Sequence, residues 1–366
     1  MTVGIVGAGQ LGRMMALAGY PLGLDFLFLD PAEQAPAAQL APVLQSAFTD
    51  EEALGTLGSR CEVVTIDWEN VSVEALRRLG RATRVSPPLP AIAAAQDRVR
   101  EKRLFEKLAI TTTRWRAVSN RRQLKSAIAD IGLPGVLKTR RMGYDGKGQA
   151  VLRTAADADR AWTQLGQVAL LYEELVPFDL EVSVIGVRSR SGECRVYPLN
   201  HNLHSDGILR LTRAPYGSAR LNRLARQHVV AVMEHFRYVG VLTIEFFVRG
   251  GRLVANEMAP RVHNSGHWTI EGAVTSQFEN HLRAIVGLPL GDTHAIGHSA
   301  MINLIGTMPG RAALLRHPGL HLHDYAKQPR PGRKLGHLTL VEADAGRCER
   351  RARRLLAELA PQIHIP

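Results

Sequence analysis

The chain has 366 residues, 45% hydrophobic and 22% charged, a composition typical of a globular protein that excludes a mostly disordered chain. Lysine and arginine (46) outnumber aspartate and glutamate (34), and the formal net charge of +12 favours an anionic partner: a phosphate compound, a nucleic acid or an acidic membrane surface. The three cysteines form no CxxC pair, which argues against a disulfide framework or a zinc site and fits a cytoplasmic location. No apolar run reaches the ~18 residues that cross a bilayer and no signal-peptide pattern is present, so we expect no membrane partner.

The chain opens with a predicted strand at 2–6, the glycine turn Gly7-x-Gly9-x-x-Gly12, a helix, and a second strand at 24–29 that ends in Asp30. With a further strand at 61–66, this order predicts a βαβ unit and a parallel sheet. The turn matches the dinucleotide fingerprint, in which helix N-terminal amides bind a pyrophosphate and an acid binds the ribose. A nicotinamide or flavin enzyme is therefore one interpretation, and a turn used only for tight packing is another.

The segment Ser86-Pro87-Pro88-Leu89-Pro90 predicts a linker, because proline removes backbone donors and restricts its neighbour. The remaining elements are predicted as a helix at 91–109, short strands and turns at about 136–211, a helix at 221–236, a hairpin of strands at 241–248 and 253–258, and a basic amphipathic helix at 347–359.

A glycine-rich segment at 143–149 lies between a predicted strand that ends in Lys138 and a return strand at 150–152. Flexible glycine amides can fold over phosphate groups, with Lys138 as a fixed positive charge beside them. The plainer interpretation is a solvated Gly-Lys turn.

A further strand breaks at Pro177 and is followed by Glu181 on the next strand. A strand that breaks at a proline can present free main-chain groups to a base edge, and Glu181 can then accept two ribose hydroxyls. Alternatively, Glu181 is only the polar residue of an alternating strand.

The predicted hairpin carries two acids, Glu245 and Glu257, among apolar neighbours. Such carboxylates cost free energy to desolvate unless a cation meets them, and Mg²⁺ prefers oxygen ligands that it shares with substrate phosphates. A two-residue turn at Gly250-Gly251 would turn Glu257 to the other face, whereas a three-residue bulged turn at 249–251 puts Glu245 opposite Ala255 with Glu257 diagonal to it. The metal hypothesis therefore predicts the three-residue turn.

The segment 261–267 follows directly and brings a cation, two imidazoles, an amide and a hydroxyl together. His263 and His267 have the spacing of a helical zinc pair, but Asn264-Ser265-Gly266 is a poor helix interior and no third soft ligand is suitably spaced. We therefore expect a loop that holds an anion: carboxylate, bicarbonate or phosphate.

Taken together, the lysine strand, the glycine flap, Glu173-Glu174-Leu175-Val176 and the paired hairpin acids resemble the ATP-grasp ligases. From residue 3 to about residue 340, the amino-acid sequence is similar to that of the N5-carboxyaminoimidazole ribonucleotide synthetase family. The segments that carry this resemblance are 7–14, 67–71, 96–98, 143–149, 256–261, 263–267 and 332–337.

The resemblance implies an ATP-grasp fold of mixed α/β and α+β class, with an N-terminal Rossmann-like domain (1–95), an ATP-grasp domain (96–292, lid about 113–180) and a small C-terminal domain (293–366). It implies an ATP-dependent carboxylase that joins bicarbonate to 5-aminoimidazole ribonucleotide in purine biosynthesis through carboxyphosphate, with ATP and Mg²⁺ and without NAD or FAD. It also implies a cytoplasmic homodimer and product transfer to a downstream mutase.

The resemblance assigns roles residue by residue. For ATP it implies Arg98, Lys138, Gly143, Tyr144, Asp145, Gly146, Lys147, Gly148, Gln149, Glu173, Glu174, Leu175, Val176, Glu181, His204, Asn256 and Glu257, with Glu245 and Glu257 holding the metal. For the acceptor ribonucleotide and bicarbonate it implies Glu69, Tyr144, Asp145, Lys147, Arg261, His263, Asn264 and Ser265, with Lys327, Arg333 and Lys334 at the 5′-phosphate. The catalytic set it implies is Lys147, Arg261, His263 and Asn264.

Three other functions compete. An oxidoreductase explains the first thirty residues but leaves Lys138, Glu245 and Glu257 without a role. A nucleic-acid-binding protein would use the net charge and the basic tail, but aromatic residues are only 5% and no nucleic-acid motif occurs. Another ATP-grasp ligase, such as a formate-dependent glycinamide ribonucleotide transformylase, fits the 263–267 and Arg333-Lys334 segments less well.

Overall fold

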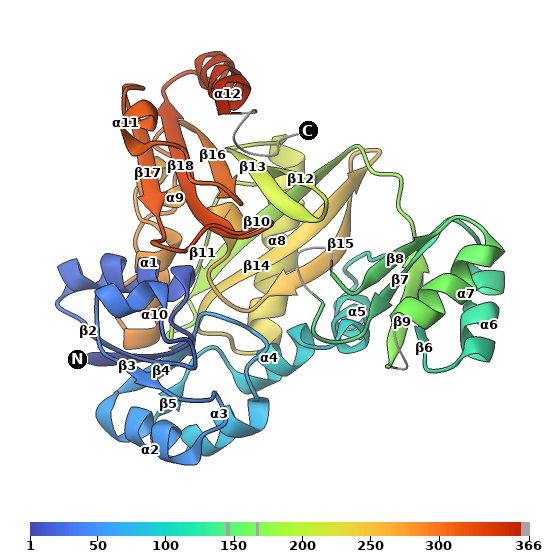
Figure 1. Ribbon diagram of the computed structural model, residues 1–366, viewed down its shortest axis with the longest axis horizontal. Helices are drawn as coiled ribbons and strands as arrows, with labels where there is room; N and C mark the ends of the chain where they lie inside the picture. Colours follow the sequence, from blue (N-terminus) through green and yellow to red (C-terminus); the bar gives the residue numbers. More distant parts are fainter. Residues whose placement is uncertain (144–146, 166–167, 360–366) are drawn as a thin grey trace.

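The computed structural model describes residues 1–143, 147–165 and 168–359 and contains three β-sheets (Figure 1). The first is a parallel five-stranded sheet of order β3-β2-β1-β4-β5, and the pairing of β1 with β2 confirms the predicted βαβ unit. The inner strands β1 and β4 are almost entirely buried, and they carry few polar residues for that reason. The elements are β1 (Thr2–Val6), α1 (Gln10–Gly19), β2 (Asp25–Asp30), β3 (Val43–Gln45), α2 (Glu51–Arg60), β4 (Val63–Ile66), α3 (Val73–Leu79) and β5 (Arg84–Val85), with 3₁₀ turns at Tyr20–Leu22 and Pro36–Gln39.

The second sheet is antiparallel, has the order β6-β9-β7-β8 and forms a separate lobe with two helices (green in Figure 1). The sequence pattern predicts only short strands and turns from about 136 to 211, so helix α7 within that range is a correction. It begins because Thr154 and Asp157 form a capping box, with aspartate in place of the usual glutamate. The elements are β6 (Trp115–Val118), α6 (Arg121–Ile131), β7 (Gly135–Thr139), β8 (Gln149–Leu152), α7 (Ala155–Gln164) and β9 (Leu170–Glu174).

The third sheet has nine strands, in the order β15-β14-β10-β12-β13-β16-β18-β17, with β11 paired to β10. Strand β13 pairs with β16, so the C-terminal strands continue the sheet that carries the hairpin acids. The elements are β10 (Leu180–Arg188), β11 (Cys194–Val196), β12 (Asn200–Ser205), β13 (Ile208–Ala214), α8 (Ala219–His235), β14 (Gly240–Arg249), β15 (Arg252–Ala259), α9 (Thr269–Gly272), α10 (Gln277–Val286), β16 (His298–Ile305), α11 (Arg311–Leu314), β17 (Leu320–Asp324), β18 (Lys334–Glu342) and α12 (Ala345–Leu359).

The predicted linker and the single helix at 91–109 are both wrong in detail. Helix α4 (Leu89–Ala95) starts within the proline segment, because Pro90 lies in the first turn, where a missing N–H costs nothing. The helix stops at Gln96, and Asp97 starts α5 (Arg98–Lys107) by accepting hydrogen bonds from the Val99 and Arg100 amides.

One hydrophobic core joins the first sheet to the third. Helix α1 packs against α10 in this core. Thr65 on β4 also contacts α10, where its Oγ1 lies 2.9 Å from His281 Nε2. The carboxyl ends of β1 and β4 are thereby fixed relative to the hairpin acids. Within the described residues, no helix combines the length and apolarity needed to cross a membrane.

Candidate active site

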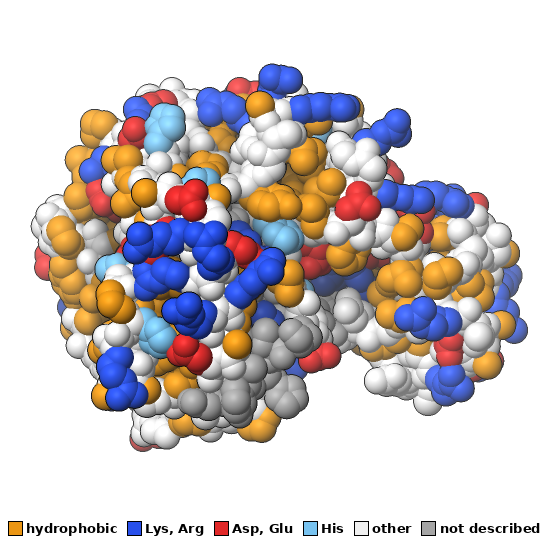
Figure 2. Space-filling view, turned by 90° about the horizontal axis from the view of Figure 1, so that it is seen from above, with side chains coloured by type: hydrophobic (Ala, Val, Ile, Leu, Met, Phe, Trp, Pro, Cys, Tyr) orange, Lys and Arg blue, Asp and Glu red, His pale blue; other side chains and the backbone are white. Residues whose placement is uncertain are grey.

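A cavity of about 630 Å³ lies where the three sheets meet. The first sheet contributes Gly9 and Glu69 to its lining, the lobe contributes Lys138, and the nine-stranded sheet contributes Glu245 and Lys334. Figure 2 shows the molecule hollowed between its main body and the smaller lobe, with acidic and basic side chains deep in the hollow. The cavity therefore brings together segments from nearly the whole length of the chain.

The turn of the acid hairpin differs from the prediction. Arg249 pairs with Arg252, so the turn has two residues, Gly250 and Gly251, and not three. The extra residue is Asn256, which forms a bulge further along β15, and Glu245 then pairs directly with Glu257. The carboxylates share one face, as the metal hypothesis requires, but a bulge within the strand brings this about.

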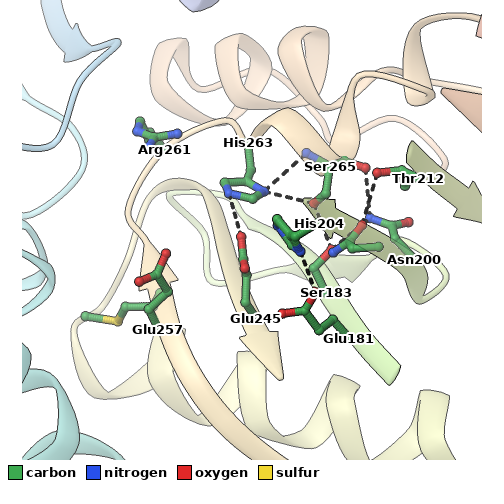
Figure 3. Close-up of polar contacts among 12 residues, drawn as sticks. Glu181, Ser183, Asn200, His204, Thr212, Glu245, Glu257, Arg261, His263 and Ser265 are labelled. Atoms are coloured by element: carbon green, nitrogen blue, oxygen red, sulfur yellow. Dashed lines mark hydrogen bonds and ion pairs between the residues drawn. The ribbon is translucent and has the colours of Figure 1, made fainter. Parts of the chain in front are cut away.

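Each hairpin acid has a nitrogen partner in the cavity, and Figure 3 shows the contact between Glu245 and His263. Arg98 Nη1 lies 3.0 Å from Glu257 Oε2, and His263 Nε2 lies 3.0 Å from Glu245 Oε1. Burial raises the pKa of Glu245, but the hydrogen bond from His263 and the charges of His263, His204 and Lys334 together outweigh burial and lower that pKa to about 2. Glu245 is therefore ionised at neutral pH.

This donor set fits Mg²⁺. Glu245, Glu257 and Asn256 all offer oxygen, and Asn256 Oδ1 is buried without a hydrogen-bond partner in the described parts of the chain. Mg²⁺ is commonly held by one or two carboxylates together with substrate phosphates, and the described residues contain no cluster of three His, Cys, Asp or Glu that would hold a metal alone.

Arg261 is fixed by Glu69, which comes from the loop after β4. Arg261 Nη2 lies 2.9 Å from Glu69 Oε1, and Nε contacts the other carboxylate oxygen, so the pair is bidentate. Burial raises the pKa of Glu69, but the guanidinium beside it lowers the pKa below its ordinary value. Glu69 therefore orients Arg261 across the boundary between the first and third sheets.

His263 lies at the end of a buried hydrogen-bond chain (Figure 3). Its Nδ1 accepts from the Ser265 amide at 3.3 Å and lies 2.8 Å from Ser265 Oγ, which in turn accepts from Ser183 Oγ at 2.7 Å. An accepting Nδ1 leaves the proton on Nε2, which faces Glu245. Ser265 is fully buried and supports His263 without lining the cavity.

His267 does not join His263. The segment Asn264–Gly266 is a single 3₁₀ turn, and His267 is 1% exposed and packs against His337 and Phe278 at ring distances of 4.8 and 5.5 Å. Asn264 remains in the cavity lining, and neither of its amide atoms has a hydrogen-bond partner within the described residues. It is positioned to bind a small ligand.

The buried carboxylate of Glu173 is paired with other side chains of the protein. Its carboxylate contacts Lys138 Nζ, lies 3.1 Å from Lys102 Nζ and accepts from Thr113 Oγ1 at 2.6 Å. The two lysines lower its pKa despite its burial. The Glu173 side chain therefore orients Lys138, and the next residue but one, Leu175, reaches the cavity.

The structure brings most of the expected nucleotide residues together. Glu181 Oε2 lies 2.6 Å from His204 Nδ1 in the lining. Tyr144, Asp145 and Gly146 lie outside the described residues. The other members of the set that line the cavity are Arg98, Lys138, Gly143, Lys147, Gln149, Leu175, Asn256 and Glu257, whereas Gly148, Glu173, Glu174 and Val176 do not.

The acceptor set is also largely gathered. Its lining members are Glu69, Lys147, Arg261, His263, Asn264 and Lys334, whereas Ser265, Lys327 and Arg333 do not line the cavity. Lys327 Nζ contacts the side chain of Gln10, which does line it, and burial lowers the pKa of Lys327 to about 8.

In the glycine turn of the first sheet, the backbone amides donate to aspartate side chains of the protein itself. The Gly9 and Gly12 amides donate to Asp67 Oδ2 at 2.6 and 3.4 Å, and the Ala8 amide donates to Asp30 at 2.7 Å. Gly7 has φ +102°, and a Cβ there would lie 1.8 Å from Asp67 Oδ1. The amides that a pyrophosphate would need are therefore already used, and Asp30 is not free for a ribose.

Three residues that support this site have no role in the sequence-based assignment: Asp67, Glu101 and Lys102. Asp67 follows β4, whose carboxyl end meets that of β1 in the parallel sheet, so its position was a usable signal. Glu101 and Lys102 are buried charges on a helix whose periodicity gave no sign of their role.

Three family models match the chain. A ribonucleotide synthetase preATP-grasp domain matches residues 1–96, an ATP-grasp domain matches 103–278, and a phosphoribosylaminoimidazole carboxylase C-terminal domain matches 299–351. These matches confirm the predicted ATP-grasp fold with its N-terminal pre-ATP-grasp and C-terminal domains.

Individual relatives agree. A curated N5-carboxyaminoimidazole ribonucleotide synthase from Pseudomonas aeruginosa is 50% identical over 344 residues, 94% of this chain and 95% of the relative. The crystal structure of the synthetase from Thermus thermophilus has a TM-score of 0.94 at 49% identity and covers 100% of this chain and 99% of its own. A synthase structure from Aspergillus clavatus in complex with ADP and 5-aminoimidazole ribonucleotide has a TM-score of 0.91 at 28% identity over 98% of each chain.

Proposed function

The chain belongs to the N5-carboxyaminoimidazole ribonucleotide synthase family, and from that premise we propose how its residues divide the work. The activity is the ATP-dependent carboxylation of 5-aminoimidazole ribonucleotide in purine biosynthesis. The observation that carries the residue assignment is the pairing of Glu245 with Glu257 in a cavity also lined by Arg98 and Lys138. Anionic and cationic groups of this kind suit a triphosphate with its metal.

At the nucleotide end, Lys138 and Arg98 bind phosphate oxygens. Lys138 stands on a strand and is oriented by Glu173, so little side-chain entropy is lost on binding. Glu245, Glu257 and Asn256 hold Mg²⁺, which neutralises charge on the phosphates when bound. Glu181 and His204 receive the ribose, and the chain around Leu175 receives the base.

At the acceptor end, Arg261, His263 and Asn264 surround bicarbonate. Arg261 is held by Glu69, so its remaining N–H groups face developing negative charge without reorganising. His263 is held by Ser265, and its Nε2–H donates to Glu245 at the side of the same site. A bicarbonate oxygen attacks the γ-phosphorus, ADP leaves, and carboxyphosphate forms. The amine of the ribonucleotide then attacks this species or the CO₂ that it releases, and phosphate departs.

The phosphate of the acceptor is bound by the cationic group at the C-terminal strands. Lys334 lines the cavity, and Lys327 reaches its edge through Gln10. Lys147 lines the cavity beside the reacting groups, where it helps to exclude water from the labile intermediate.

We also propose that the domains divide at 1–95, 96–292 and 293–366, that two copies form a homodimer in the cytoplasm, and that the product passes to a downstream mutase. These proposals rest on the family resemblance. Sedimentation of the purified chain tests the dimer: a single species of 40.2 kDa would contradict it.

The residue assignment is tested by measuring ADP release with ATP, bicarbonate or 5-aminoimidazole ribonucleotide omitted in turn. We expect full turnover only with all three, and loss of that turnover in Arg261→Met and Lys138→Met. Turnover with formate and glycinamide ribonucleotide in place of the last two would favour the transformylase alternative.

A further inference from the structure

The bulge at Asn256 leaves backbone groups that strand pairing cannot satisfy. Strand β15 is the last strand of its sheet, with β14 on one side only. A bulged residue has no cross-strand partner and locally weakens the ladder. Because the bulge is what brings Glu245 opposite Glu257, whatever holds it also holds the two acids together.

Two consecutive residues of helix α5 hold it. The Met258 amide donates to Glu101 Oε1 at 2.6 Å, and Lys102 Nζ donates to the Asn256 carbonyl at 3.2 Å and to the Ala255 carbonyl at 3.4 Å. The contacts therefore lie on both sides of Glu257. Glu101 and Lys102 replace the missing neighbouring strand at this point.

The segment after α5 supports the same edge. The Ala255 amide donates to the Thr111 carbonyl at 2.7 Å, and Thr112 Oγ1 donates to the Ala255 carbonyl at 2.9 Å. These contacts stop at Ala255, so the bulge itself and the residue after Glu257 depend on α5.

Burying ionisable side chains to hold the bulge of β15 costs free energy. Glu101 and Lys102 are each 2% exposed, and burying ionised groups costs more than burying apolar ones of similar size. Burial and the nearby charge of Glu257 raise the pKa of Glu101 to about 8, so the ionised form of Glu101 is disfavoured at this position. An apolar pair would pack here more cheaply, but it would leave the bulge amide and carbonyls without partners.

Lys102 also reaches the lobe. Its Nζ lies 3.1 Å from Glu173 Oε2, and the other oxygen of Glu173 contacts Lys138. One ammonium group thus links the strand of the hairpin acids to the lysine assigned to the ATP phosphates.

We propose that Glu101 and Lys102 are positioning residues for the metal site, because they hold the bulge that keeps Glu245 and Glu257 side by side. This inference rests on the proposed Mg²⁺ site at those two acids. Neither residue needs to touch the metal or the substrates.

Four variants separate this role from general stability. Glu101→Leu removes the acceptor for the Met258 amide, whereas Glu101→Gln keeps one. Lys102→Met removes the ammonium and leaves Glu173 paired with Lys138. Lys107→Met is the matched control, since Lys107 is an exposed lysine on the same helix.

The first measurement is Mn²⁺ binding in the presence of ADP, followed by electron paramagnetic resonance. We expect Glu101→Leu and Lys102→Met to weaken binding by about tenfold, the lower end of what loss of a supporting residue costs a metal site. Glu101→Gln and Lys107→Met should bind as the unchanged protein does. Unchanged binding in both Glu101→Leu and Lys102→Met, with thermal unfolding showing them folded, would overturn the proposal.

The second measurement is hydrogen exchange at the Met258 amide, which needs no metal. We expect exchange to be faster in Glu101→Leu and unchanged in Glu101→Gln; equal exchange in Glu101→Leu and the unchanged protein would refute the contact. Should Glu101→Leu not fold, Lys102→Met decides on the Mn²⁺ measurement.

Glu257→Gln distinguishes the two proposals. If it binds Mn²⁺ normally, the metal assignment fails, and the exchange measurement still decides whether Glu101 holds the bulge. If it loses Mn²⁺ while Glu101→Leu and Lys102→Met retain it, only the positioning role fails.

Discussion

The glycine turn of the first sheet and the acid hairpin of the third sheet are both sequence patterns typical of phosphate chemistry, but they end in opposite situations. At the turn, the amides of Gly9 and Gly12 already donate to Asp67. At the hairpin, Glu245 and Glu257 face the cavity, and the neighbouring Asn256 Oδ1 has no partner in the described chain. A binding pattern becomes a binding site only where the protein leaves its polar groups open to a ligand.

The same contrast explains why the dinucleotide interpretation is not supported. The glycine pattern was real, but its purpose is to let Asp67 approach the backbone, as the position of a Cβ at Gly7 shows. Asp67 is followed by Glu69, which fixes Arg261, so the turn anchors a loop that serves the cavity.

The largest expected effect is at the hairpin. Glu257→Gln keeps the size of the side chain and removes the charge, so Mg²⁺ binding and ADP release at limiting Mg²⁺ should fall by about a hundredfold, since even supporting residues cost a metal site 10–100-fold. A Mg²⁺ titration of ADP release measures this. Turnover equal to that of the unchanged protein at limiting Mg²⁺ would refute the role of Glu257.

The next effect concerns the link between the two regions, the pair of Glu69 and Arg261. Glu69→Gln leaves the guanidinium without its charge partner, and we expect the free energy of unfolding to fall by about 2–3 kcal/mol, less than for a fully buried pair. The Glu69 side chain is 20% exposed and that of Arg261 is 15% exposed, so we expect a smaller loss of stability than for a fully buried ion pair. The double variant Glu69→Gln with Arg261→Gln should recover stability but not carboxylation, and failure of denaturant unfolding to show that recovery would contradict the pairing argument.

The third prediction concerns how activity depends on pH through Lys327, which contacts Gln10 beside the glycine turn. Burial lowers the pKa of Lys327 to about 8, so its ammonium is present below that pH and is lost above it. If it binds the acceptor phosphate, kcat/KM for the ribonucleotide should fall by up to about tenfold per pH unit above pH 8. Lys327→Arg should lack this decline, because guanidinium stays charged. A wild-type profile that stays level to pH 9.5 at saturating bicarbonate would remove Lys327 from the phosphate site.

The last effect is a change of stability with pH at Asp67. Burial raises its pKa to about 6, above the value in the unfolded chain, so its contribution to stability is complete at low pH and is lost as the pH rises through about 6. Asp67→Asn should remove a slope of up to about 1.4 kcal/mol per pH unit between pH 4 and 6. Thermal unfolding of both proteins over this range checks it, and parallel curves would show that Asp67 does not titrate there. NADH fluorescence should show no saturable binding to either protein.

Sequence patterns predicted what depends on neighbouring residues: the βαβ unit, the strand that ends in Lys138, and the hairpin acids. They could not predict what depends on distant contacts. The turn at Gly250-Gly251 was predicted wrongly because the bulge at Asn256 is held by α5, about 150 residues earlier in the chain. The burial of Glu173 between two lysines likewise depends on how the lobe meets α5.

The site residues divide in the same way, into those that lie in local motifs and those whose roles depend on distant contacts. Many of the residues that the resemblance implies line the cavity, because they lie in short local motifs. Asp67 lies in one of the resembling segments without an assigned role, and Glu101 and Lys102 lie outside all of them. Their contacts with distant backbone groups arise only in the folded chain. Ser265 was expected at the substrate and proved to support His263 from inside.

The nine-stranded sheet has a geometric consequence. Strands β14 and β18 are five steps apart in it, roughly 24 Å if the sheet were flat. Yet Glu245 on β14 and Lys334 on β18 line one cavity, and the charge of Lys334 contributes to lowering the pKa of Glu245. The sheet must therefore curve toward the cavity, and the degree of that curvature sets how far Glu245 and Glu257 stand from Lys334.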